Sequence, residues 1–466
     1  MKQWLSHVLW KRVGVLTFAL LWGLAGDATF AADTFLWRTN QDQVTADIQS
    51  WPLSKLLERV ASETGWRVYV EPGTTHTVSA KFDKFKPGEA LHYLLGDLSF
   101  ALVPGSNSSP RLLVFRTVQE RATQAVLAAN TSAKVPGGKA IPNELIVRLK
   151  PGAKIDDLAR KLGAKVIGKI DALNAYRLQF DDAEAASSAR ESLGSNSDVA
   201  SVDSNYAVDR PENPAQAMPG TSARPLQLQL RPPGDNGKIV VGLVDTGVQP
   251  LGNNLDQFLL KQLSVSGDSV LDPSSPSHGT SMAETVLRSL QQMTQGNTSV
   301  QILPVDVYGA NASTTTFDVA SGVVLAVNNG ANPINLSLGS SADSQFLHDI
   351  IKQAASQGIL FIGAAGNEHV STPYYPGAYP EVKGVTAVDN GQIAPYANFN
   401  SSITLGAPGT SLVYFNNLMY QVMGTSASSA FISGVAAGYM DKTQGKASAA
   451  QSFLQSNFGI KIVPKQ

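Results

Sequence analysis

Short apolar runs that alternate with helical segments constrain the fold of the C-terminal half more than any other feature of the sequence. The runs are short and almost uniformly apolar, so we expect strands buried on both faces of a sheet. They cover Ile239–Val244, Ile334–Leu338 and Ile359–Ile362. The helical segments cover Ser281–Met293, Thr314–Val327 and Ser344–Gln357. This alternation predicts a doubly wound parallel sheet of the α/β class.

Four short motifs in the same half carry groups that suit acyl transfer. They are Val-Asp-Thr-Gly at Asp245, His-Gly-Thr at His278, Ala-Ala-Gly-Asn ending at Asn367 and Gly-Thr-Ser-Ala at Ser426. A serine hydroxyl becomes a nucleophile when a neutral imidazole takes its proton and a carboxylate orients that imidazole. We therefore expect Ser426 to be the nucleophile, His278 the general base and Asp245 the orienting acid. The Asn367 amide and the backbone N–H of Ser426 would stabilise an oxyanion.

The chain order Asp, His, Ser differs from the order in α/β-hydrolases and in chymotrypsin-like enzymes. Taken singly, each residue has an ordinary structural interpretation, such as a cap or a loop residue. Order and motifs together resemble the subtilisin-like serine protease family from about Ile239 to the C-terminus. Three further segments match the family: Ile334–Gly339, Tyr375–Pro380 and Leu405–Gly409. The resemblance implies a serine endopeptidase that cleaves polypeptides through an acyl-enzyme.

The resemblance also assigns substrate contacts and exposes departures from the family pattern. It implies that Ser337, Leu338 and Gly339 bind the substrate. Tyr374 stands at a position that is often Gly in the floor of the S1 pocket, so a smaller pocket is expected. Glu284 stands where many members have Gly, and we expect its carboxylate to be solvated. The alternative to an enzyme is a catalytically silent envelope scaffold that uses the fold for binding; an intact triad favours the enzyme.

Composition limits the other classes of function. A chain of 466 residues is too long for one core and predicts two to four domains. Its net charge of −1 gives no electrostatic case for nucleic acid. There is no Cys, hence no disulfide. No cofactor or metal site is expected, and the sequence identifies no calcium site although structural calcium would be compatible with it.

Residues 1–31 are typical of a signal peptide. Lys2, Lys11 and Arg12 precede an apolar run from Val13 to about Gly26, and small residues suited to cleavage end at Ala31. The run is shorter than a bilayer requires, so no permanent membrane span is expected. We therefore predict export to the periplasm or the medium.

Two small α+β domains are expected before the catalytic domain. Residues 34–117 resemble the short N-terminal domain of secretins and some TonB-dependent receptors, which implies contact with an envelope protein; a generic spacer is the alternative. A linker follows over 118–141. Residues 142–208 have the strand and helix order βαββαβ of a ferredoxin-like domain.

The second small domain carries a further resemblance. The segment Glu144–Gly152 and the later Ser204–Tyr206 resemble the propeptide of subtilisin-like proteases. This implies an intramolecular prodomain that assists folding and inhibits by placing its tail in the cleft, in a self-inhibited precursor. An accessory domain that stays attached is the alternative. A Pro-rich linker over 209–233 leads to the catalytic domain, 236–466.

Overall fold

The computed structural model describes residues 34–38, 43–103, 110–126, 138–213, 215–218, 226–234, 237–252 and 254–460. The predicted signal peptide, 1–31, lies outside these residues. Among the helices that the structure describes, none is long and apolar enough to cross a membrane.

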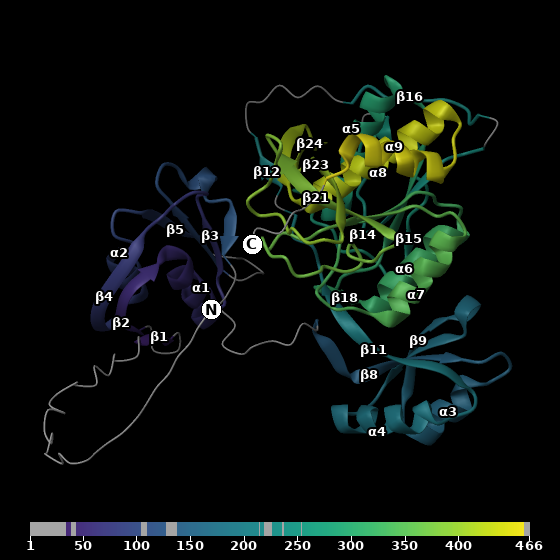
Figure 1. Cartoon of the computed structure of the whole chain (residues 1–466), viewed down its shortest axis with the longest axis horizontal. Coiled ribbons are helices and arrows are strands. Elements are labelled where there is room, and N and C mark those ends of the chain that lie inside the picture. Colours follow the sequence, from purple (N-terminus) through teal and green to yellow (C-terminus); the bar gives the residue numbers. More distant parts are fainter. Residues whose placement is uncertain are drawn as a thin grey trace, which may run out of the picture.

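Within the described residues, the first small domain contains two α-helices and two sheets (Figure 1). The helices are α1 (Leu53–Thr64) and α2 (Pro87–Leu95). One sheet has the order β1 (Thr34–Arg38), β2 (Gln43–Pro52), β4 (Thr77–Phe85). The other has the order β5 (Ser99–Val103), β6 (Arg111–Phe115), β3 (Arg67–Val70), β7 (Gln124–Val126). Because β7 pairs with β3, this sheet extends into the segment 118–141 that was expected to be a linker.

The second small domain is ferredoxin-like, as the sequence predicts. Its elements are β8 (Ala140–Leu149), α3 (Ile155–Leu162), β9 (Lys165–Ile170), β10 (Ala175–Gln179), α4 (Ala183–Gly194) and β11 (Val199–Asp209). The antiparallel sheet has the order β11-β8-β10-β9. Strand β11 runs past its predicted end at Val202, because Ala207–Asp209 pair with β18 (Ser313–Thr315) of the C-terminal domain. One sheet therefore joins the two domains (Figure 1).

The C-terminal domain is the doubly wound α/β unit that the sequence predicts. Its sheet has the order β15 (Leu263–Ser264), β17 (Gln301–Asp306), β14 (Val240–Asp245), β19 (Ile334–Leu336), β20 (Phe361–Ala364), β21 (Val382–Asp389), β22 (Gln392–Ile393). A further strand, β23 (Ile403–Pro408), pairs with β21. Neighbours in this sheet are parallel except β21 and β22.

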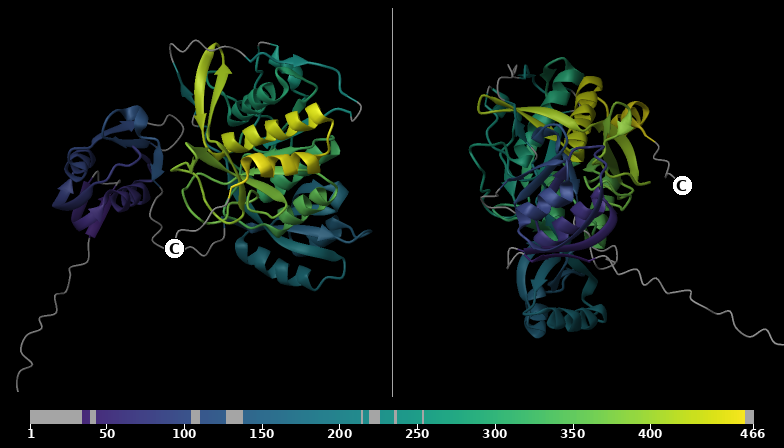
Figure 2. Two further views of the ribbon diagram at one scale, coloured as in Figure 1. Left: turned by 45° about the horizontal axis from the view of Figure 1, so that its top comes forward. Right: turned by 90° about the vertical axis from the view of Figure 1, so that its left-hand side faces the viewer.

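Helices cover both faces of this sheet. On one face lie α6 (Thr316–Asn328) and α7 (Gln345–Ser356). On the other lie α5 (His278–Thr294) and α8 (Thr425–Thr443), with α9 (Ala447–Phe458) beside α8 (Figure 2, left). Outside the sheet, β12 (Gln216–Ala217) pairs with the hairpin of β24 (Thr410–Phe415) and β25 (Leu418–Met423). Strand β13 (Gln229–Leu230) pairs with β16 (Asn297–Thr298).

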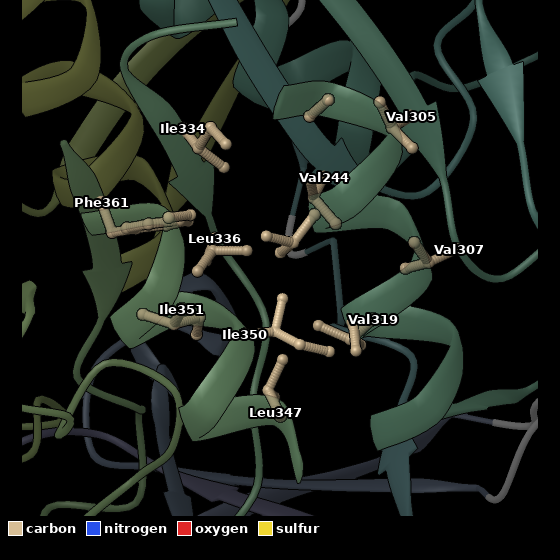
Figure 3. Packing of buried hydrophobic residues seen from close by; sticks show 14 of the residues in the cluster. Val244, Val305, Val307, Val319, Ile334, Leu336, Leu347, Ile350, Ile351 and Phe361 are labelled. Atoms are coloured by element: carbon tan, nitrogen blue, oxygen red, sulfur yellow. The ribbon is translucent and has the colours of Figure 1, made fainter. Parts of the chain in front are cut away.

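Strand β14 shows why the runs are apolar throughout. Its Val244 packs towards α6 and α7, with Val319 and Ile350 among its neighbours in the cluster (Figure 3). Val241 and Leu243 point to the opposite face and belong to the cluster under α5. Burial on both faces requires apolar residues at every position until the strand ends at Asp245. The first polar side chain of the strand therefore lies at the carboxyl edge of the sheet, where open α/β sheets bind ligands.

Candidate active site

A buried carboxylate and imidazole form the centre of the site. Asp245 ends β14 and is fully buried, and His278 is the first residue of α5 and is 3% exposed. His278 Nδ1 lies 2.7 Å from Asp245 Oδ1, which also accepts the backbone N–H of Thr246 at 2.6 Å. With Nδ1–H donated to the carboxylate, Nε2 of a neutral imidazole is left as a proton acceptor.

The start of α5 is locked against the turn that follows β14. Ser277 caps the helix by accepting from the N–H of Thr280, and its hydroxyl donates to Gly247 O at 2.7 Å. Gly279 N donates to Thr246 Oγ1 at 2.8 Å. A Cβ atom on Gly279 would lie 2.2 Å from Thr246 O, so only glycine permits this approach. The helix starts three residues before its predicted start at Ser281, which makes His278 part of a rigid element.

Ser426 lies in the first turn of α8, close to the segment that follows β19. Its Oγ donates to Ser337 O at 3.2 Å, and Ser337 Oγ donates back to Ser426 O at 3.1 Å. Ser337 Oγ is also held by the amide of Asn335 at 2.7 Å and lies 2.8 Å from Ser429 Oγ. These bonds fix the Ser337–Gly339 segment beside the helix that carries Ser426.

Asn367 is placed beside the same helix terminus. Its Oδ1 accepts the backbone N–H of Thr425 at 2.8 Å, which leaves the Nδ2 donors for another partner. A Cβ atom on Gly424 would lie 3.2 Å from Asn367 Nδ2. The N–H groups of the first turn of a helix have no acceptor within the helix. The Asn367 amide therefore lies beside the first turn of the helix that carries the Ser426 N–H.

A residue that the sequence did not reveal holds the loop of Asn367. Asn398 is buried, and its Oδ1 accepts the backbone N–H groups of Glu368 at 3.0 Å and Val370 at 3.1 Å. Its Nδ2 donates to Ala365 O at 2.9 Å and to Glu368 Oε2 at 2.8 Å. Burial raises the pKa of Glu368, and the hydrogen bond from Asn398 opposes that rise. A lone Asn in a loop gives no sequence signal for this role.

Tyr374 fills the space between two glycines of the site. A Cβ atom on Gly339 would lie 2.6 Å from Tyr374 Cε1, and one on Gly366 would lie 3.0 Å from Tyr374 Cγ. The aromatic ring therefore lies between the Ser337–Gly339 segment and the Ala365–Asn367 segment. Burial raises the pKa of the phenol far above its usual value.

Glu284 corrects a prediction from the sequence. We expected this carboxylate to be solvated, but it is fully buried on the face of α5 that meets β24. It pairs with Arg288 at 2.8 Å and accepts the backbone N–H of Tyr414 at 2.7 Å. Burial raises its pKa to about 7, while these two partners oppose the rise. Glu284 thus ties the histidine-bearing helix to the hairpin that precedes Ser426.

The chain that leaves β11 runs beside this site. Arg210 N donates to Ala312 O at 2.9 Å, which continues the pairing of β11 with β18. Asn213 then donates to the carbonyl of Pro276, two residues before His278. Beyond it, Gln216 and Ala217 pair with β25, the strand that leads to Ser426. The described residues of this stretch therefore contact the loop before His278 and the strand before Ser426.

The first small domain touches the same segment. Tyr69 Oη donates to Glu212 Oε2 at 3.0 Å, and Arg67 Nη1 lies 3.2 Å from Glu212 Oε1. Burial, and secondarily the charge of Glu212, raises the pKa of Tyr69 to about 12. Among the described residues, no group of three or more His, Asp or Glu side chains could hold a metal ion.

Comparison with known families gives two matches. Residues 236–456 match the subtilase family, and residues 127–205 match the fervidolysin N-terminal prodomain. Residues 206–235 lie between the two matched regions.

Similar sequences come from bacterial proteases. The chain is 36% identical over 165 residues to the thermostable alkaline protease of Halalkalibacterium halodurans, covering 34% of this chain and 46% of that protein. It is 31% identical over 214 residues to subtilisin DY of Bacillus licheniformis, covering 44% and 77%. The chain spans about half the length of the first curated relatives that it matches, 46% and 51%.

Two solved structures have the same fold. Fervidolysin from Fervidobacterium pennivorans, described as a keratinolytic enzyme related to subtilisin, has a TM-score of 0.52 at 18% identity, covering 67% of this chain and 57% of that one. A variant of the epidermin leader peptide processing serine protease of Staphylococcus aureus has a TM-score of 0.52 at 16% identity, covering 67% and 92%. At these identities the likeness concerns the fold alone.

Proposed function

Because the chain belongs to the subtilase family, we propose that it is a serine endopeptidase that hydrolyses peptide bonds through an acyl-enzyme on Ser426. The observation that carries the proposal is the buried pair of Asp245 and His278, 2.7 Å apart at the carboxyl edge of the sheet. A buried carboxylate that orients an imidazole in this way prepares it to take a serine proton.

The proposed reaction uses the groups at the start of α8. The Ser426 hydroxyl rotates from Ser337 O towards His278, whose Nε2 accepts the proton as Oγ attacks the substrate carbonyl. The Asn367 amide and the Ser426 N–H stabilise the resulting oxyanion. His278 then donates its proton to the leaving amine, and water repeats the sequence to release the acyl group. Ser337 O, once free, accepts a backbone N–H of the substrate.

We assign substrate binding to Ser337, Leu338 and Gly339, with Tyr374 as the limit of the S1 pocket. The position of the Tyr374 ring between Gly339 and Gly366 supports this assignment. A ring in that space leaves room for a small side chain, so substrates with Gly or Ala before the cleaved bond are favoured.

The protein is proposed to be a self-inhibited precursor. Residues 142–208 act as the intramolecular prodomain, and the linker 209–233 as the segment to be cut. The contact of Asn213 with Pro276, just before His278, and the pairing of Gln216 and Ala217 with β25, just before Ser426, support this proposal. Contacts at the start of α6 support it further: Asn205 Oδ1 accepts from Phe317 N at 3.1 Å, and Arg177 lies 3.1 Å from Asp318.

Export and an envelope partner complete the proposal. The signal-peptide pattern of residues 1–31 supports export to the periplasm or the medium. Residues 34–117 are proposed as a protein-contact domain like that of secretins and TonB-dependent receptors. The ion pair of Arg67 and the hydrogen bond of Tyr69 with Glu212 support a role for this domain in binding extended chain segments.

A fluorophosphonate probe tests the proposed activity. It should modify the purified protein after processing, and peptide mapping should locate the adduct on Ser426. The Ser426→Ala protein is the control and should remain unmodified. Absence of labelling under every processing condition would reject the enzyme and favour a catalytically silent scaffold.

A further inference from the structure

Arg210 is held by a short run of the C-terminal domain that we call the arginine cradle, residues 308–312. The guanidinium donates from Nε to Asn311 O at 2.9 Å and from Nη2 to Gly309 O at 2.7 Å. Its central carbon lies 5.3 Å from the centroid of the Tyr308 ring. The backbone N–H of Arg210 donates to Ala312 O at 2.9 Å. Two side-chain hydrogen bonds, one backbone hydrogen bond and the Tyr308 ring therefore hold Arg210.

The backbone of the cradle is held within the C-terminal domain. Tyr308 is fully buried, and its hydroxyl donates to Asp209 O at 3.1 Å. The cradle begins two residues after β17, whose last residue, Asp306, pairs with Asp245 in the sheet. Asp306 also accepts the N–H groups of Tyr308 and Gly309. The bond to Asp209 is lost when the segment that carries Arg210 leaves, but the two bonds to Asp306 lie within the C-terminal domain, so we expect the cradle to keep its backbone shape.

Backbone alternation sets the register that we expect for a substrate beside the cradle. The Arg210 N–H is bonded to Ala312 O, so we expect the N–H of the next residue of a substrate in this register to face the opposite way, towards the Ser337–Gly339 segment. Ser337 O is there, next to the Ser426 hydroxyl. A substrate residue whose N–H meets Ser337 O would present its own carbonyl to Ser426. In this chain the residue after Arg210 is Pro211, which has no N–H to donate.

We propose that the arginine cradle is a substrate subsite, and that the enzyme selects peptides with arginine two residues before the cleaved bond. The proposal rests on the proposed function. A planar guanidinium has several fixed donors that can reach two carbonyls at once, and its charge is attracted to the ring face. A lysine ammonium lacks the planar fork, and a neutral side chain gains neither charge-assisted hydrogen bonds nor the attraction to the ring.

The test uses the processed full-length protein, with active sites counted by the fluorophosphonate. Four internally quenched peptides differ at one position, which holds Arg, Lys, citrulline or norleucine; an alanine follows it. Citrulline keeps the shape of arginine without its charge. We expect kcat/KM for the Arg peptide to exceed that for citrulline and norleucine by about 10- to 100-fold, with Lys between them. Mass spectrometry should locate the cut after the alanine.

Variants of the ring provide a second readout that does not depend on the amount of folded protein. Tyr308→Leu should reduce the ratio of Arg to norleucine turnover to a few-fold, whereas Tyr308→Phe, which keeps the ring, should preserve it. The matched control Tyr93→Leu, on the exposed face of α2, should leave the ratio unchanged. Turnover without preference for Arg, or a cut directly after Arg, would overturn this inference and leave the peptidase intact. If the protein shows neither peptide turnover nor fluorophosphonate labelling, the proposed function fails together with this inference.

Discussion

Replacing Arg177 by methionine should loosen the ferredoxin-like domain from the protease domain. Arg177 binds Glu144 through Nε at 2.8 Å and Nη2 at 3.0 Å, and reaches Asp318 of α6 through Nη1 at 3.1 Å. Methionine would leave two carboxylates facing each other at the interface. The Glu144 side chain is 5% exposed, and those of Arg177 and Asp318 are each 18% exposed.

The expected size follows from this burial. Truncating one partner of a buried, hydrogen-bonded charge pair at an interface costs about 2–5 kcal/mol. The partial exposure of Arg177 and Asp318 places the cost in the lower half of that range, at about 2–3 kcal/mol, or roughly 30- to 150-fold in the fraction of open molecules. Burial raises the pKa of Asp318 and Arg177 opposes the rise, so protonation should relieve the repulsion in the variant. The effect should therefore be smaller at pH 5 than at pH 8.

The assay is the rate at which a fluorophosphonate labels the uncleaved full-length protein, since only molecules with an open cleft react. Arg160→Met is the control, because Arg160 pairs with Asp157 on the solvated face of α3. It should change the rate by less than about threefold. If Arg177→Met labels no faster than the parent protein at pH 8, the interface does not hold the precursor closed, and the reasoning is refuted.

Three further predictions concern the site and its support. Asn367→Ala should lower kcat by about 100- to 1000-fold with KM nearly unchanged, and a loss confined to KM would argue for substrate positioning instead. Tyr374→Gly should extend cleavage from small residues to Phe and Leu before the cut bond, and an unchanged profile would place Tyr374 outside the pocket. Glu284→Gln should remove a pH dependence of stability. The pKa of Glu284 is about 7 in the folded protein and 4.5 ordinarily, so the protonated group stabilises the folded parent fully below pH 4.5. This contribution to the free energy of unfolding, about 3 kcal/mol in total, is lost as the pH rises through 7. Unfolding followed by far-UV circular dichroism in a Ser426→Ala background measures this, because all six tryptophans lie at or before Trp66 and none lies in the protease domain. A parent and variant that respond alike between pH 4.5 and pH 8 would contradict the assignment.

The doubly wound sheet was predictable because strands buried on both faces must be apolar at every position, as β14 is. The end of this strand at Asp245 was also predictable, because Asp245 is the first polar residue after the apolar run. The start of α5 was placed three residues late, although Ser277 is a helix-capping residue type and caps it in the structure. The burial pattern of a strand and the residue types that cap a helix are therefore enough to locate β14 and the start of α5 from the sequence.

Contacts between distant segments could not be predicted. The extension of β11 depends on β18, more than 100 residues further along the chain. The burial of Glu284 depends on the N–H of Tyr414, which a hairpin brings to α5. The contacts of the arginine cradle likewise join Arg210 to residues about 100 positions further along the chain. A single sequence carries no signal for such pairings.

The most direct test of the central claim is a double-mutant cycle on the proposed nucleophile and base. Peptidase kcat/KM should be measured for Ser426→Ala, His278→Ala and the double variant, each processed by the parent enzyme in trans. Because proton transfer and attack are one step, either single change should remove nearly all activity and the second should add little. Losses that multiply, with the double variant far below both single variants, would contradict a shared role for Ser426 and His278.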